Sequence, residues 1–106
     1  MNVREDLPAA GRRALVGAFT RAVHEIPTVR GVRIGTRVVH GATYEAQAID
    51  TADYLIAIDF DDLEGLQAYL RHPAHQELGA RFGESLRSAL IYDFEVGGLE
   101  RLDGLV

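Results

Sequence analysis

The sequence predicts an α+β domain in which an antiparallel sheet carries helices on one face. Some segments repeat apolar residues at the spacing of a helix, whereas others alternate apolar with polar or small residues, as a strand does. These segments follow each other as helix, strand, strand, helix, short helix and strand, and Met1–Arg4 leaves room for a stub of first strand. A chain of 106 residues supports one core, so we expect a single domain over residues 1–106.

The first helix is expected from Ala9 to Glu25. Pro8 suits the first turn of a helix and Pro27 suits its exit. The buried face is marked by apolar residues at helical spacing, namely Leu15, Phe19, Ala22, Val23 and Ile26. Two further helices are expected at 61–71 and 72–86. Asp61 and Asp62 favour the first of these starts.

The second of these helices begins in the run His-Pro-Ala-His. His72 suits the cap position and Pro73 the first helical position. The same helix places a stripe on one face, formed by His75, Leu78, Phe82 and Leu86.

Period-two patterns predict strands at 28–40, 52–60 and 89–96. The middle one is apolar on both faces, with Leu55 and Ala57 on one face. Its other face carries Tyr54, Ile56, Ile58 and Phe60. Residues 41–50 have no clear period and are expected to form a loop, and residues 97–106 a C-terminal arm.

This order of elements is that of the ferredoxin-like split β-α-β unit, with a truncated first strand. The helices cover one face of such a sheet, and the chain has no element left for the other. We therefore expect the face that carries Leu55 and Ala57 to pack against the sheet of a second copy, giving a homodimer.

Composition excludes several kinds of function. The net charge of −5 and the scattered arginines disfavour nucleic acid. There is no cysteine for a disulfide or thiolate site and no lysine for a Schiff base or P-loop. No apolar run is long enough to cross a membrane, and the charged start is unlike a signal peptide, so we expect a cytoplasmic protein. A metal site is not expected, since His72 and His75 lack a third ligand. We expect no cofactor.

Three stretches together resemble the stress-responsive dimeric α/β-barrel (Dabb) family. They are "IPTVRGVRIG", "YLIAIDFDDLEGLQAYLRHPAHQELG" and "LIYDFEV", and the resemblance spans Leu7 to Val96. It implies a ferredoxin-like homodimer whose two sheets form a barrel.

The resemblance also implies a candidate chemistry. One family member, olivetolic acid cyclase, folds a linear polyketide and closes its ring by an aldol-type condensation. Its catalytic histidine corresponds to His75, its substrate-orienting tyrosine to Tyr69, and an aspartate of its last strand to Asp93. Two other histidines of that pocket are not retained, because one aligns with Tyr54 and the other lies on the truncated first strand.

The residues themselves allow the same site. His75 shares the inward stripe of its helix, where a neutral imidazole can act as a general base, and Asp93 is the expected partner that orients it. Tyr69 can hold or polarise a carbonyl oxygen. Aromatic residues expected to line the pocket are Tyr54, Phe60 and Phe82.

Three functions therefore stay open. The first is a cofactor-independent lyase or isomerase, similar to a polyketide cyclase, that acts on a polyketide-like, apolar or carbonyl-bearing small molecule. The second is a non-catalytic stress-response or interaction dimer, in which His75 is a buried histidine satisfied by one hydrogen bond and the aromatic residues are core. The third is an oxygenase or isomerase of the wider ferredoxin-like group, since this fold supports many chemistries.

Overall fold

A computed structural model describes residues 1–105 of the chain. In chain order the elements are β1 (Asn2–Val3), α1 (Ala9–Glu25), β2 (Val29–Thr36), the 3₁₀ helix η1 (Thr43–Gln47), β3 (Tyr54–Phe60), α2 (Leu63–Arg71), α3 (Pro73–Ser85), β4 (Leu86–Ser88) and the 3₁₀ helix η2 (Leu99–Leu105). The expected bounds of α1 are confirmed. Within the described part of the chain, no helix combines the length and the apolar character needed to cross a membrane.

The main sheet is the antiparallel ladder of β2 and β3. Ile34 lies opposite Ile56, and Gly35 lies opposite Leu55. Successive side chains of a strand point to opposite faces. Ile58 and Phe60 pack against the helices, so Leu55 and Ala57 point to the other face, as expected.

A second, shorter sheet is formed by β1 and β4, which pair antiparallel. The N-terminus joins it to the first: the Met1 ammonium group donates to the Tyr54 carbonyl oxygen at 2.6 Å, and the Tyr54 N–H donates to the Met1 carbonyl oxygen at 3.1 Å. The strands therefore follow each other across the molecule as β4, β1, β3 and β2.

The buried side chain of Asn2 holds this junction together. Its amide nitrogen donates to the Thr51 carbonyl oxygen at 2.8 Å and to Ser88 Oγ at 2.9 Å, and its Oδ1 accepts from the Asp53 N–H at 2.7 Å. One polar residue thus ties β1 to both β4 and the start of β3. This satisfied network explains how so short a strand keeps its place.

One edge of β3 is open. Residues of a strand direct their N–H and C=O groups to alternate sides. The backbone groups of Tyr54 bond Met1, on the side away from β2. The carbonyl oxygen of the preceding residue, Asp53, accepts from Arg37 on the β2 side. By this alternation, the backbone groups of Ile56 and Ile58 also point away from β2. No hydrogen bond to them is found on that side within residues 1–105. The two residues of β1 reach only the beginning of this edge.

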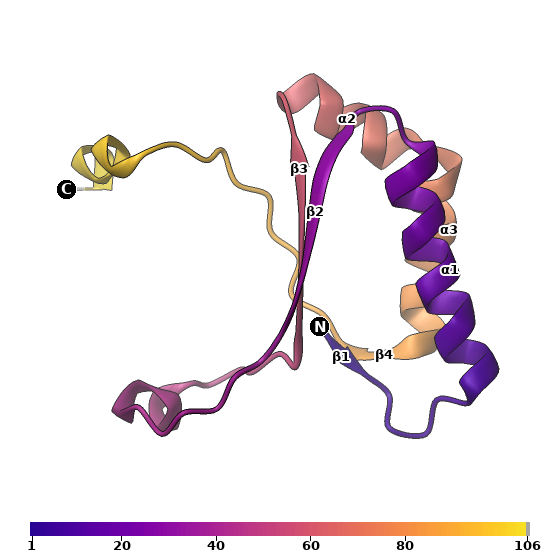
Figure 1. Cartoon of the computed structure of the whole chain (residues 1–106), viewed down its shortest axis with the longest axis horizontal. Helices are drawn as coiled ribbons and strands as arrows, with labels where there is room; N and C mark the ends of the chain where they lie inside the picture. Colours follow the sequence, from indigo (N-terminus) through magenta and orange to yellow (C-terminus); the bar gives the residue numbers. More distant parts are fainter. Residues whose placement is uncertain (106) are drawn as a thin grey trace.

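All three α-helices lie on one side of the β2–β3 ladder, with α1 and α3 side by side (Figure 1). The core lies between these helices and the start of the ladder. Its buried members are Ala18, Ala22, Ile26, Tyr69, Ala74 and Leu78, against which Phe19, Val29, Ile58, Phe60, Leu66 and Phe82 pack. The helical face of the sheet is covered at that end only, since Ile34 is exposed.

The strand predicted at 89–96 is not formed. The structure ends β4 at Ser88, and residues 89–96, the closing segment, have no regular structure. The physical reason is that β1 pairs only with residues 86–88, which leaves the segment without a partner strand. Its large apolar side chains are all exposed, namely Leu90, Ile91, Tyr92, Phe94 and Val96.

Two segments project from the body on the side of the ladder that faces away from the helices (Figure 1). One is the connection between β2 and β3, where a loop was expected and η1 is found. The other is the expected C-terminal arm, whose residues 99–105 form η2; residue 106 lies outside the described residues. The radius of gyration is accordingly 15.9 Å, compared with about 13 Å for a compact chain of this length.

Candidate functional site

Three rings form a contiguous group, the aromatic cluster, made of Phe60, Tyr69 and His75. The ring centroids of Phe60 and Tyr69 are 5.0 Å apart, and those of Tyr69 and His75 are 4.7 Å apart. Both pairs are tilted, within the range in which aromatic rings attract each other. Tyr69 is 7% exposed, while His75 is half-buried and so remains reachable from solvent.

The cluster is built from the end of β3 and the two helices that follow it. At the start of α2, Asp62 Oδ1 accepts from the Gly65 N–H at 2.7 Å, as its position before the helix predicts. At the start of α3, His72 Nδ1 accepts from the Ala74 N–H at 3.0 Å, with Pro73 in the first turn. The predicted cap role of His72 is confirmed.

The phenol of Tyr69 is electrostatically distinct. Burial raises the pKa of the Tyr69 phenol above its ordinary value, and the negative charge of Asp93 adds to the increase. Its oxygen has no hydrogen-bond partner within residues 1–105, yet it is not sealed from solvent. The group is therefore a neutral O–H that is free to donate to a ligand oxygen.

Asp93 lies on the closing segment and is exposed. Its charge reaches Tyr69, but in the described part of the chain it makes neither a hydrogen bond nor an ion pair with His75. The structure thus brings Tyr69 and His75 together and leaves Asp93 at the margin of the cluster. The predicted His75–Asp93 pair stays a prediction.

The other expected lining residues are separated. Phe82 packs on Phe19, with centroids 5.4 Å apart, between α3 and α1. Tyr54 is 38% exposed and lies at the base of the sheet, where its backbone bonds Met1. Of the three, Phe60 is the one in direct contact with Tyr69.

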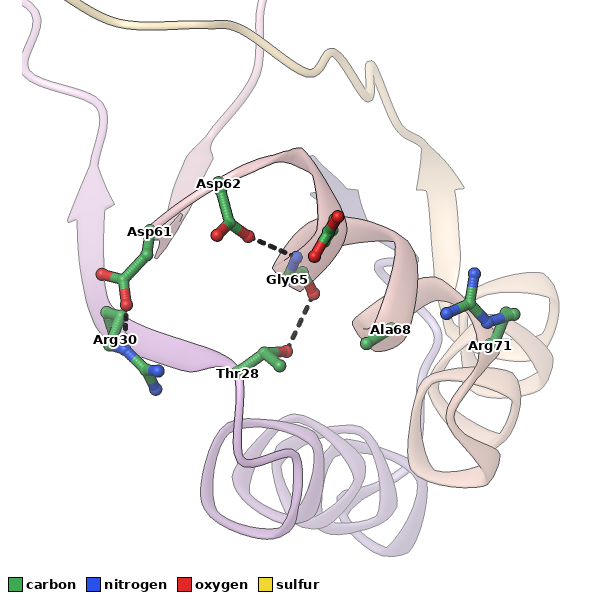
Figure 2. Close-up of a pocket in the computed structure, with 8 residues that line it drawn as sticks. Thr28, Arg30, Asp61, Asp62, Gly65, Ala68 and Arg71 are labelled. Atoms are coloured by element: carbon green, nitrogen blue, oxygen red, sulfur yellow. Dashed lines mark hydrogen bonds and ion pairs between the residues drawn. The ribbon is translucent and has the colours of Figure 1, made fainter.

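The surface has a polar depression of about 410 Å³ at the start of α2 (Figure 2). Several of its polar groups have partners: Arg30 Nε donates to Asp61 Oδ2 at 2.7 Å, and Thr28 Oγ1 donates to the Gly65 carbonyl oxygen at 2.8 Å. Glu64 and Arg71 also line it. A wider depression lies along residues 94–104 of the arm. Neither is lined by Tyr69 or His75.

One histidine, His40, has no role predicted from the sequence but lies among several hydrogen-bond partners. His40 Nε2 lies 3.0 Å from the Tyr44 hydroxyl oxygen, and His40 Nδ1 accepts from the Ala42 N–H at 3.3 Å. Glu45 accepts from the N–H of Gly41, whose φ of 81° suits glycine. The spacing His-x-x-x-Tyr across a turn is the signal that could have indicated this pair. It lies on the exposed connection between β2 and β3.

In the residues that the structure describes, no group of three or more histidine or acidic side chains is placed to hold a metal ion. The chemistry that this site can perform rests on the imidazole of His75, the phenol of Tyr69 and nearby carboxylates. These groups support proton transfer and carbonyl polarisation without an added centre.

Comparison with protein families identifies one match. The model of the stress responsive A/B barrel domain, Dabb, matches residues 1–96. The match includes both helices that build the aromatic cluster and all of the closing segment. No curated protein gives a significant match.

Three solved structures share the fold. A protein of Arabidopsis thaliana is 18% identical, with a TM-score of 0.72, over 92% of this chain and 90% of its own. A dimeric protein of unknown function and ferredoxin-like fold from Bacteroides fragilis is 23% identical, with a TM-score of 0.53, over 88% of each chain. A dimeric ferredoxin-like protein of unknown function from Thermobifida fusca is 18% identical, with a TM-score of 0.58, over 82% of this chain and 76% of its own. The predicted α+β, ferredoxin-like fold is confirmed.

Proposed function

Because the chain belongs to the stress responsive A/B barrel domain (Dabb) family, we propose that it forms a homodimer in which each aromatic cluster binds a small carbonyl compound and promotes aldol-type ring closure. The observation that carries this proposal is the contact between a neutral, buried phenol and a half-buried imidazole, 4.7 Å apart between ring centroids. The cytoplasmic location and the independence of cofactors that the sequence predicts are part of the proposal.

The proposed reaction is a proton transfer followed by carbon–carbon bond formation. The neutral imidazole of His75 removes a proton from the carbon next to a ketone, and the electron pair moves onto the ketone oxygen. The Tyr69 O–H donates a hydrogen bond to that oxygen as its negative charge develops. The enolate carbon attacks a second carbonyl of the same molecule, and the imidazolium returns its proton to the new alkoxide. No oxidant or reductant is required.

Asp93 has a secondary role in this proposal. Its charge would stabilise the imidazolium that forms on His75, as a carboxylate does for a general base. Beside burial, which is the larger cause, its charge also raises the pKa of the Tyr69 phenol. We expect Asp93→Asn to reduce turnover less than a change at His75.

The homodimer is supported by the exposed face of the ladder, here called the far face. Its apolar part is Leu55 and Ala57 beside Gly31 and Gly35, and the exposed ion pair of Arg33 with Asp59 lies on the same face. Leu55 is 64% exposed. None of the three α-helices of the described chain lies on this side of the ladder (Figure 1). The Bacteroides and Thermobifida relatives are dimeric proteins. A second copy packed sheet to sheet would remove this apolar surface from water.

The test of the chemistry uses a short linear triketone, in which a terminal methyl carbon can attack the distal carbonyl, close a six-membered ring and lose water to give a dihydroxytoluene. Product is followed by NMR with wild type, His75→Ala and Tyr69→Phe. We expect His75→Ala to lower the rate by about 100-fold or more, as for loss of a general base. Leu15→Ala, which removes a buried side chain of α1 outside the cluster, serves as the control for folding. Equal rates in wild type and His75→Ala would refute the proposal.

The non-catalytic dimer is the second candidate. The observation in its favour is that neither of the two depressions described above is lined by Tyr69 or His75. In that case the wild type does not accelerate ring closure, and His75→Ala changes thermal stability alone.

A further inference from the structure

His72 stands between α2 and α3 and is bonded to both residues of the Tyr69–His75 contact. Its N–H donates to the Tyr69 carbonyl oxygen at 3.1 Å, which closes the last turn of α2. Its carbonyl oxygen accepts from the His75 N–H at 3.0 Å and from the Gln76 N–H at 3.2 Å, which opens the first turn of α3. Its side chain adds the cap to Ala74.

The two rings touch because the chain turns sharply between them. Tyr69 lies in the last turn of α2 and His75 in the first turn of α3, so their side chains would point apart if one continuous helix joined them. His72 interrupts the helix with extended backbone angles, φ −70° and ψ 140°. Pro73 favours that conformation in the residue before it.

We infer that His72 is a positioning residue, whose side-chain bond to the Ala74 N–H sets the distance and tilt between Tyr69 and His75. The inference rests on the proposed function, because it assigns the residue that prepares that site for its substrate. His72 itself does not touch the substrate. The backbone bonds hold the ends of the two helices, and the imidazole fixes the angle at which α3 starts.

The side-chain bond is the part that a substitution can remove. Ala74 and Tyr69 belong to the same buried core, so a change in the first turn of α3 is transmitted directly to the phenol. Without an acceptor, the Ala74 N–H is left unsatisfied at a partly buried helix start. We expect the turn to relax, the two rings to separate and Tyr69 to become more hydrated.

Asparagine is the matched replacement. Asn Oδ1 is attached to Cγ, as His Nδ1 is, and it accepts from the N–H groups of a first helical turn. His72→Asn therefore keeps the bond while removing the ring, whereas His72→Ala removes both. His72→Gly removes the acceptor with a smaller loss of helix stability and serves if the alanine variant does not fold.

The experiment measures ring geometry without substrate. Two signals are followed in the full-length protein: the ring-current shift of the His75 imidazole protons in NMR spectra, and the ultraviolet titration of the Tyr69 phenolate, assigned with Tyr69→Phe. We expect His72→Ala or His72→Gly to reduce the ring-current shift and to bring the pKa of Tyr69 down toward its ordinary value. His72→Asn should restore both signals.

Asp62→Ala is the control for a purely structural cap. It removes a bond of the same kind from the start of α2, at 2.7 Å, and should lower thermal stability without changing either signal. If His72→Ala and His72→Gly lower stability but leave both signals at their wild-type values, His72 is a cap only and the inference is wrong. Failure of the proposed chemistry is distinct, because the wild type would then not convert the triketone while both signals still respond to His72.

Discussion

The helical layer and the outer part of the sheet differ in how complete they are within one chain. Between α1, α2 and α3, here called the complete half, the core side chains are buried and the starts of α2 and α3 are capped. The other part, here called the incomplete half, consists of the far face, the closing segment and the open edge of β3. Its apolar side chains are not covered by any other part of the described chain. Leu78 is 3% exposed, whereas Leu55 is 64% exposed.

This contrast indicates that one chain on its own covers one face of its sheet and leaves the other face exposed. In the described chain, all three α-helices lie on one side of the β2–β3 ladder and none lies on the other side (Figure 1). In the proposed homodimer, the second layer is the sheet of the other copy, which brings a surface of the same size and character. The candidate site lies in the complete half, within reach of the charge of Asp93 on the closing segment.

The largest effect is expected from a charged substitution on the far face, in the incomplete half. Leu55→Arg would place an unpaired charge on the far face of both subunits, at about 3–5 kcal/mol for each buried charge. Analytical ultracentrifugation should show monomers. Val16→Arg is the matched control, because Val16 lies on α1 and is also 64% exposed. A dimer that persists in Leu55→Arg would exclude the far face as the interface.

Next in size is a change in the complete half. Leu78→Ala removes a buried side chain from the contact of α3 with the core and should cost about 2–5 kcal/mol of unfolding free energy. Leu63→Ala, at a position that is 66% exposed, should change it by less than about 0.5 kcal/mol. Urea unfolding measures both. Similar losses in the two variants would show that the core is not where the structure places it.

Tyr69 gives a smaller, pH-dependent effect. Its pKa is higher in the folded state, so the folded protein binds more protons and its stability falls as pH rises. The contribution is fully present below the ordinary tyrosine pKa of about 10 and is lost above it. Wild type should therefore lose more stability than Tyr69→Phe as pH rises above about 10. Tyr92→Phe, at an exposed position, should follow the wild type, and parallel curves for Tyr69→Phe would contradict the expectation.

The smallest effect is expected at the exposed ion pair between Arg21 of α1 and Glu77 of α3. The hydrogen bonds from Arg21 lower the pKa of Glu77, so the stability due to this pair is present above the ordinary glutamate pKa and is lost as pH falls through the lowered value. Glu77→Gln should lower the melting temperature slightly at neutral pH and not in acid. Glu64→Gln, on α2, is the control. Equal melting temperatures at neutral pH would show that the pair contributes nothing.

Sequence patterns predicted the complete half well, because its signals are local. Proline and capping residues mark where α1, α2 and α3 begin, and the bounds of α1 agree at both ends. The contact of Tyr69 with His75 follows from a tyrosine that ends one helix and a histidine that starts the next. Such features depend on a few neighbouring residues and are therefore visible in the chain itself.

The incomplete half was predicted less well, because strands depend on distant partners. The alternation at 89–96 is typical of a strand, but a strand forms only beside another of matching length, and β1 has two residues. The position of Asp93 relative to His75 depends on the same missing partner. Tyr54 and Phe82 were expected beside the cluster as aromatic residues that line a cavity, an expectation that does not indicate which neighbour each ring contacts.

The open edge of β3 has a consequence for how this protein is produced in a cell. Until a subunit is covered, the free backbone groups of Ile56 and Ile58 and the uncovered apolar segment can pair with any extended chain nearby. In newly made subunits, assembly therefore competes with aggregation, and the outcome depends on their concentration and rate of synthesis. Slow expression should yield more native protein than rapid overproduction, and inclusion bodies are the expected result of the latter.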